Sequence, residues 1–514
     1  MGTVIRESIK SSFASYIGLI IGTINVVFLY TKFLTPEQLG LTRVLQDSTL
    51  LFVAFAQLGS PSIIIRFFPQ FADRTGQNNG FFSFVITYSF LGFLIFSLIF
   101  WGMQNIYLNF YAQKSPLILK YFFYVIPFVL GVVFINVLES YLIIQNKVFF
   151  ATFIREVFLR IANTIGIILI ATNVIDFTNF LSLIVLSYFL AIIFLIFYTR
   201  KFTVVYFKLS FKLFHNSKFG SILKYGLYTI LGGIGFLLSS KIDTLMLPAF
   251  RGLKETAIYS VALFIATVIE IPKKNLIRSV LPSLSFAINK NDIRTIDSIY
   301  KKTSINLFII GLLIFLVIWV NIDDLFRIIP NGDIYIAGKT VLFVFLLSRI
   351  IDLLTGVNNE IILYSKFYFY GLVLIILLGI LTVTTNLIFI PIYGILGAAL
   401  ASALSLIIYL SFEVFLIWKK FRSQPFSKNT IKAFILFLFI WLIAWSLKQF
   451  WNSFSLDHVT NLVDILIVIS SIIFKTIILV TIFIVLFIKL NISNDFSGLI
   501  FKILERIKYQ LKLK

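Results

Sequence analysis

The chain has 514 residues, of which 59% are hydrophobic and only 13% are charged, and its mean hydropathy is +1.00. This composition excludes an ordinary soluble domain, and the lack of cysteine excludes disulfides, a thiol nucleophile and a thiolate metal site. In so apolar a chain, the formal net charge of +22 indicates Lys and Arg in cytoplasmic loops and beside anionic headgroups, not a nucleic-acid partner.

Apolar segments of about twenty residues recur along the whole sequence, and each is long enough to cross about 30 Å of hydrocarbon as a helix. The first ends at Phe33 and is expected to be a retained helix, because it has no A-x-A-like cleavage site. We predict roughly fourteen spans and therefore an all-α polytopic membrane protein. The spans begin near Ser12, Leu41, Phe81, Leu119, Phe153, Phe180, Tyr225, Ala257, Ser304, Ile336, Tyr368, Gly394, Ile431 and Leu462.

The distribution of cations predicts the topology. Connections after even-numbered spans are rich in Lys and Arg, as at 199–224, 272–302 and 419–432, whereas those after odd-numbered spans are poor in them. Roughly thirty of the 44 Lys and Arg residues fall on one side and roughly nine on the other, so the cation-rich side is predicted to be cytoplasmic. An even number of spans then places both termini in the cytoplasm.

The connections and one weak repeat predict the domain organisation. No connection reaches the length of about fifty residues that a soluble domain needs, and no Gly-rich phosphate-binding loop is present, so the chain carries no ATPase. The hairpin LTPEQLGLTRVL at 34–45 aligns with GLKETAIYSVAL at 252–263. The two are either products of a six-span duplication, which in transporters forms two lobes around a substrate path, or unrelated similar hairpins. We predict an N-terminal lobe at 1–200, a cytoplasmic linker at 201–224, a C-terminal lobe at 225–418, two further spans at 419–490 and a basic tail at 491–514.

The seventh span contains two charges and a glycine cluster. A charge at mid-bilayer costs about 2.5–3.5 kcal/mol, so each one requires a structural or functional reason. Lys241 and Asp243 are two residues apart and face different sides of a helix, so each is expected to meet another partner. Each belongs either to a substrate or ion path or to a structural ion pair between helices, and Lys241 has the further alternative of snorkelling to the interface. The glycines favour either a bending helix or close packing, and they are Gly226, Gly232, Gly233 and Gly235.

Other charges in the spans are also candidates. Arg43 begins the second span on the outer side, where the topology rule requires no cation. Arg349 and Asp352 in the tenth span are three residues apart and can pair on one helix face, which favours a structural interpretation. Glu270 in the eighth span precedes two lysines within salt-bridge reach, and Lys475 in the last span has no local partner.

The remaining acids in or near spans include Asp47, Glu139 and Glu413, and they have no spacing pattern of a metal or acid/base site. No enzymatic activity, bound metal or cofactor is therefore expected.

Two sequence motifs resemble a known family. LTPEQLGLTRVLQDSTLLFVAFAQLGSPSIIIRFFPQF at 34–71 and NLIFIPIYGILGAALASALS at 386–405 are similar to the polysaccharide-transport branch of the multidrug/oligosaccharidyl-lipid/polysaccharide superfamily, the Wzx-type O-antigen flippases. The resemblance implies two six-helix lobes around a central cavity, followed by two C-terminal helices. It also implies a cofactor-free flippase of the cell inner membrane that moves undecaprenyl-diphosphate-linked oligosaccharides to the outer leaflet by alternating access, for O-antigen and lipopolysaccharide synthesis.

The implied cargo assigns roles to the charges. An anionic diphosphate needs cations in the membrane, and Arg43, Lys241 and Arg349 are the substrate-binding candidates. The ion-coupling or cavity candidates are Asp243, Glu270 and Asp352. Expected partners are the lipid-linked glycan, membrane lipids, a coupling ion that is either a proton or sodium, a glycan polymerase and glycosyltransferases.

Two other functions are alternatives. A cation-coupled small-molecule exporter of the same superfamily would need few cavity cations and an acid as its coupling site. A membrane glycan polymerase or ligase typically has a large outer loop with catalytic Arg or His, and the sequence contains no such loop.

The predicted topology is testable because the chain lacks cysteine. Ser217→Cys and Asn289→Cys should resist membrane-impermeant thiol reagents in intact cells, whereas Lys254→Cys should be labelled. Labelling of the first two variants from outside would overturn the topology.

Overall fold

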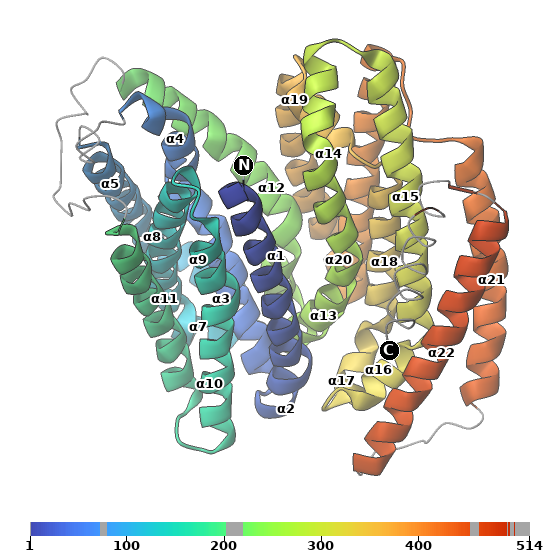
Figure 1. Ribbon diagram of the computed structural model, residues 1–514. Coiled ribbons are helices and arrows are strands. Elements are labelled where there is room, and N and C mark those ends of the chain that lie inside the picture. Colours follow the sequence, from blue (N-terminus) through green and yellow to red (C-terminus); the bar gives the residue numbers. More distant parts are fainter. Residues whose placement is uncertain are drawn as a thin grey trace. The chain divides into compact units, whose positions relative to one another are not determined.

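The computed structural model describes residues 2–71, 80–201, 219–452, 462–490, 492, 493 and 498. These residues form helices and connecting segments without strands, so the all-α prediction is confirmed (Figure 1). Most of the predicted linker, including Ser217, and most of the predicted tail lie outside the described residues.

Twelve helices among the described residues are long and apolar enough to cross a membrane. Two features account for the difference from the predicted fourteen spans. Helix α20 (Tyr368–Phe421) runs through two predicted spans and kinks at Gly394, whose φ of 60° suits glycine. The fifth predicted span is divided among α9 (Val148–Phe153), the π-helical turn η5 (Ile154–Phe158) and α10 (Leu159–Ala171).

The chain forms two compact units, and the first comprises Met1–Val261 and Gly379–Ala398. The predicted lobes at 1–200 and 225–418 stay a prediction. Besides α9, η5 and α10, the first unit contains α1 (Gly2–Thr23), η1 (Ile24–Leu29), α2 (Tyr30–Phe33), α3 (Pro36–Ala56), α4 (Ser60–Phe67), η2 (Phe68–Gln70), α5 (Phe81–Gly102), α6 (Gln104–Ala112), α7 (Pro116–Tyr121), η4 (Phe122–Tyr124), α8 (Val125–Ile144), α11 (Phe177–Thr199), α12 (Phe219–Phe250) and most of α13 (Leu253–Ala266).

The second unit comprises Ala262–Leu378 and Ala399–Lys514. Its α19 lies at one end, whereas α16 and α17 lie at the opposite end (Figure 1). Its remaining elements are η7 (Thr267–Glu270), α14 (Ile271–Asn289), α15 (Ile293–Val320), α16 (Ile322–Ile328), α17 (Gly332–Tyr335), η8 (Ile336–Gly338), α18 (Lys339–Leu354), α19 (Asn358–Tyr364), α21 (Lys428–Asn452) and α22 (Leu462–Lys489).

Each unit has its own apolar core. In the first, the buried ring of Tyr141 packs edge-on against Phe68 and Phe82, with ring centroids 5.1 and 4.9 Å apart. In the second, Tyr300 and Ile417 lie in a buried cluster that joins α14, α15, α19 and α20. Many large apolar side chains on the outer faces remain exposed, as lipid-facing helices require.

The start of α3 shows what the first residues of the motif at 34–71 do in the fold. Thr35 caps the helix in a capping box with Gln38, and Pro36 occupies the first helical position. One turn later, Gly40 lets α3 approach α13 so closely that an added Cβ would lie 2.1 Å from the carbonyl oxygen of Leu253. The motif therefore fixes a close contact between the two hairpins that align in the sequence.

Gly40→Ala should lower the thermal stability of the purified protein in detergent, because the methyl group forces α3 and α13 apart at a cost of about 1–3 kcal/mol. Gly233→Ala on α12 is the matched control, since its Cβ would meet nothing within 4 Å. A melting temperature of Gly40→Ala equal to or above that of the wild type would contradict the close contact.

Candidate substrate and coupling sites

Asp47 links α3 to α12 in the first unit. Its Oδ1 lies 2.8 Å from the Nζ of Lys241, and the hydroxyl of Thr244 donates to its Oδ2 at 2.8 Å. Asp47 is buried, whereas the side chain of Lys241 keeps 27% of its surface exposed. Lys241 is therefore anchored by one carboxylate, and part of its side chain is not covered by the described residues.

Arg43 belongs to the same group of charges. It lies one turn before Asp47 on α3, and its guanidinium interacts electrostatically with that carboxylate and with Arg160. Arg43 and Lys241 thus share Asp47, and these three groups together carry one positive charge. The structure therefore brings two of the three predicted substrate-binding residues together.

Asp243 faces a different side of α12 from Lys241, as its spacing predicts. Its Oδ2 accepts a hydrogen bond from the hydroxyl of Tyr259 at 2.5 Å, and its Oδ1 accepts one from the Nδ2 of Asn386 at 2.9 Å. Asp243 and Asn386 are both buried. The carboxylate therefore joins α12, α13 and the middle of α20.

The second family motif is held by the same unit. Asn386, its first residue, binds Asp243. Arg251 donates from Nη2 to the carbonyl of Pro391 at 2.6 Å and from Nε to that of Ile390 at 3.2 Å. A cation thus binds two backbone carbonyls close to the kink at Gly394.

In the second unit, the predicted local pair of Arg349 and Asp352 is wrong. Arg349 instead lies 2.9 Å from Glu270, and Asp352 lies 2.8 Å from the Nζ of Lys273. The segment from η7 to α14 packs against α18 and offers an opposite charge to each residue, so pairing between helices replaces pairing along one helix.

Glu270 also contacts an exposed lysine. Lys274 lies 3.7 Å from Glu270, as the four-residue spacing predicts. The side chain of Arg349 keeps 28% of its surface exposed, close to the value for Lys241. Arg349 belongs to the second unit, whereas Arg43 and Lys241 belong to the first. That all three cations bind the substrate together therefore stays a prediction.

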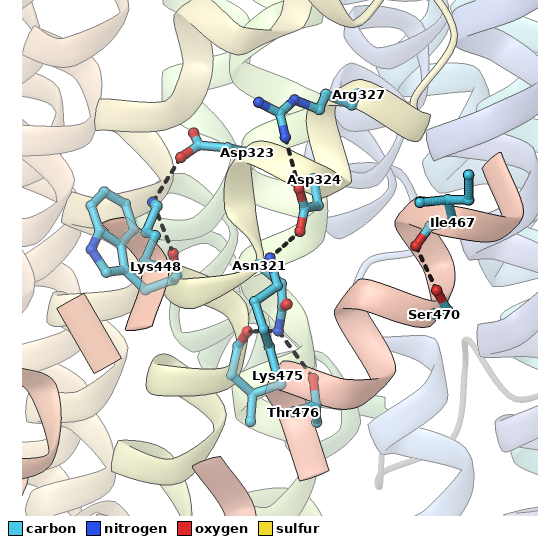
Figure 2. Close-up of polar contacts among 11 residues, drawn as sticks. Asn321, Asp323, Asp324, Arg327, Lys448, Ile467, Ser470, Lys475 and Thr476 are labelled. Atoms are coloured by element: carbon cyan, nitrogen blue, oxygen red, sulfur yellow. Dashed lines mark hydrogen bonds and ion pairs between the residues drawn. The ribbon is translucent and has the colours of Figure 1, made fainter. Parts of the chain in front are cut away.

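Lys475 has a partner that its own helix does not provide. Figure 2 shows its side chain reaching Asp324 of α16, which also accepts from Arg327 at 3.0 Å. Lys475 and Asp324 are both buried. Nearby, Asn321 donates to the hydroxyl of Thr476 at 3.0 Å, so α22 is joined to this segment by two adjacent side chains.

The neighbouring Asp323 binds two further lysines. Lys448 of α21 lies 2.8 Å away, and Lys339 of α18 is hydrogen-bonded to the same carboxylate. Burial alone would raise the pKa of Asp323, but the hydrogen bonds from the two lysines outweigh burial and hold the pKa below its usual range. Asp323 is therefore ionised at neutral pH and joins α21 to α16.

Asp47, Asn386 and Asp324 are not among the site residues proposed from the sequence. Asp47 follows Arg43 by four residues, a spacing that could have identified it. Asn386 stands at the start of the second motif. Asp324 has no such signal for Lys475, because 151 residues separate the two.

Lys475→Met should lower the free energy of unfolding by about 3–5 kcal/mol, because it leaves Asp324 buried with less compensation. The double variant Lys475→Met/Asp324→Asn should recover part of this loss, and Lys274→Met is the exposed control. Thermal unfolding in detergent measures all three, and a double variant less stable than Lys475→Met would contradict the pairing.

The fold is similar to two kinds of solved transporter structure. The lipid II flippase MurJ in an inward closed conformation matches with a TM-score of 0.69 at 16% identity, over 92% of this chain and 98% of that one. An inward-facing multidrug resistance MATE family transporter of the MOP superfamily matches with a TM-score of 0.62 at 15% identity, over 81% of this chain and 98% of that one.

The family follows from the sequence. No curated protein sequence matches the chain significantly. The family model described as "Polysaccharide biosynthesis protein" matches residues 4–285, which is more than half of the chain. The chain is therefore a multi-pass membrane protein that belongs to the polysaccharide biosynthesis protein family, in agreement with the resemblance found in its sequence.

Proposed function

We propose that this protein is a flippase that moves undecaprenyl-diphosphate-linked oligosaccharides across the cell inner membrane by alternating access. One observation carries the proposal. Lys241 and Arg349 lie in membrane-spanning helices, each is held by a single carboxylate, and each keeps more than a quarter of its side chain exposed. Such a cation is anchored by its carboxylate and still presents polar atoms that an anionic ligand can contact.

The electrostatics suit an anionic headgroup. Lys241 and Arg43 both interact with Asp47, so two cations lie close together on α3 and α12, an arrangement that suits an anionic diphosphate. Arg349 presents a planar fork of donors that binds phosphate oxygens at two points, whereas Lys241 acts as a compact point charge. The headgroup would exchange its hydration for these cations, while the prenyl tail stays in lipid and the sugar passes through a wet cavity.

Helix α12 has the local freedom that alternating access needs. Gly226 packs tightly, because an added Cβ would lie 2.9 Å from the carbonyl oxygen of Leu58, whereas a Cβ at Gly233 would meet nothing within 4 Å. Lys241 lies two turns beyond Gly233. A bend at the free glycine would therefore move the cation while the packed glycine holds the start of the helix.

Family and fold support this proposal. The matched family is described as a polysaccharide biosynthesis protein family. One similar structure is the lipid II flippase MurJ. The inner-membrane location, the O-antigen type of cargo, a coupling ion, and cooperation with glycosyltransferases and a glycan polymerase belong to the proposal.

A cation-coupled small-molecule exporter is the second candidate. The buried Asp243, bound by Tyr259 and Asn386, favours it, because an acid among neutral donors is suited to exchange an ion. Asp243→Asn distinguishes the two roles of this carboxylate. Loss of transport with normal glycan-lipid binding favours ion coupling, and loss of folding favours a structural role.

Lys241→Ala and Arg349→Ala should each stop surface display of the glycan while the protein level and membrane insertion stay normal, because the diphosphate loses a cation. Lys241→Arg should retain part of the activity, since the charge persists in another geometry. The measurement is outer-leaflet exposure of the lipid-linked oligosaccharide in cells that lack their own flippase.

Two exposed lysines provide the controls for this experiment. Lys254→Ala is matched to Lys241→Ala, and Lys274→Ala is matched to Arg349→Ala because Lys274 contacts the same glutamate from the surface. Both controls should display glycan normally. Display at the wild-type rate by Lys241→Ala and Arg349→Ala together would refute the role of the cations.

A further inference from the structure

Glu413 is a fully buried carboxyl group that the proposed substrate site does not use. It lies on α20 in the second unit with 0% of its surface exposed. The hydroxyl of Tyr409 donates to its Oε1 at 2.5 Å, and the Nδ2 of Asn358 donates to its Oε2 at 2.5 Å. Both of these donors are neutral.

The charges around Glu413 are unbalanced. Lys273 of α14 is the cation that faces it, and its ammonium group is bound to Asp352 of α18 at 2.8 Å. Glu360 of α19 adds a third carboxyl group. Among the residues that the structure describes, the titratable groups that interact with Glu413 are Lys273, Tyr300, Asp352, Glu360 and Tyr409.

Three carboxylates facing one ammonium would leave two uncompensated negative charges inside the unit, so at least one carboxyl group carries a proton. Asp352 has its own salt bridge, and both Asp352 and Glu360 are more exposed than Glu413. The proton therefore belongs on Glu413, where a charge would be the most costly.

Its neighbours can serve both the charged and the neutral carboxyl group. Asn358 is buried, and its Oδ1 has no hydrogen-bond partner among the described residues. A rotation of this amide by 180° would present Oδ1 instead of Nδ2, so that a protonated Glu413 could donate to it. The hydroxyl of Tyr409 can likewise donate or accept. Neither state of Glu413 thus leaves its own oxygen atoms unbound.

Two further polar atoms border the same cluster without a partner among the described residues. They are the hydroxyl of Tyr300, which is fully buried, and Oε2 of Glu360. Both atoms can hydrogen-bond to water. Such water can carry a proton between Glu413 and the more exposed carboxyl groups of Asp352 and Glu360.

We propose that Glu413 is the proton-exchange site of the second unit and that the coupling ion is a proton. This proposal rests on the proposed transport function. In each cycle a proton from water on one side of the membrane binds the Glu413 carboxylate, and the resulting acid later releases that proton to water on the other side. Both carboxyl oxygens are hydrogen-bonded to neutral side chains that can serve the charged and the neutral carboxyl group, which suits the exchange of a proton.

The charge change at Glu413 would reach four helices. A deprotonated Glu413 competes with Asp352 for Lys273, and these groups belong to α20, α18 and α14, while Asn358 belongs to α19. Exchange of one proton therefore alters the contacts that hold this end of the unit together.

Infrared difference spectroscopy of the purified full-length protein tests the protonation without transport. The wild type should show the C=O stretching band of a protonated carboxyl group at pH 7, which disappears as the pH rises. Glu413→Gln should lack this band, whereas Glu360→Gln and the exposed control Glu37→Gln should keep it. A full band in Glu413→Gln, or its loss in Glu360→Gln alone, would overturn the assignment.

Glycan display in cells tests the coupling. Glu413→Gln keeps the shape of the protonated side chain, and we expect at least a tenfold loss of display at a normal protein level. Glu413→Asp retains a titratable group and should keep part of the display and a shifted carboxyl band. Display by this variant would show that substitution at this position does not by itself prevent folding.

Two outcomes would refute proton coupling at Glu413 but leave the flippase proposal valid. One is wild-type display by Glu413→Gln. The other is display by the wild type that stops when the sodium gradient is removed and persists when the proton gradient is collapsed. Failure of the flippase proposal itself would show separately, as normal display in the variants of Lys241 and Arg349.

Discussion

A charge inside hydrocarbon must find its partner within the protein, and this constraint organises both units. Three ion pairs illustrate it, because each joins helices that are distant in the sequence. Asp47 holds Lys241 between α3 and α12, Glu270 holds Arg349 between η7 and α18, and Asp324 holds Lys475 between α16 and α22. Apolar packing fills the space between helices, but lipid competes for apolar faces, so the ion pairs and hydrogen bonds add the specificity that determines which helices become neighbours.

The ion pairs differ in how far the protein covers them, and the proposed division between binding and supporting residues is based on this difference. Asp324 and Lys475 are buried together, so neither side chain is exposed to a ligand. Lys241 and Arg349 are paired to carboxylates on one side only and keep part of their surface free. Glu413 represents a third arrangement, in which neutral donors surround an acid. The same requirement for compensation thus produces a buried ion pair between helices, the partly exposed cations that we propose bind the cargo, and the acid that we propose exchanges a proton.

The sequence predicts what local chemistry determines. The helical class follows from hydropathy, and the separate partners of Lys241 and Asp243 follow from their spacing on one helix. The cap at Thr35 and the glycine at Gly40 likewise lie within one motif. The local pair of Arg349 and Asp352 fails for the same reason that Asp324 could not be assigned to Lys475: spacing rules act along one helix, whereas these charges found partners on neighbouring helices that only the tertiary fold brings close.

The pairing of Lys475 with Asp324 also has a consequence for biogenesis. A lysine in the middle of the last helix opposes membrane insertion by about 2.5–3.5 kcal/mol when the helix enters alone. Its carboxylate partner is synthesised 151 residues earlier, on the segment between α15 and α18. At about 5–20 residues per second, the ribosome needs roughly eight to thirty seconds to make the intervening chain, which is ample time for the earlier helices to assemble. The last helix can therefore meet a carboxylate that is already in place, and this pairing offsets the cost of inserting its lysine.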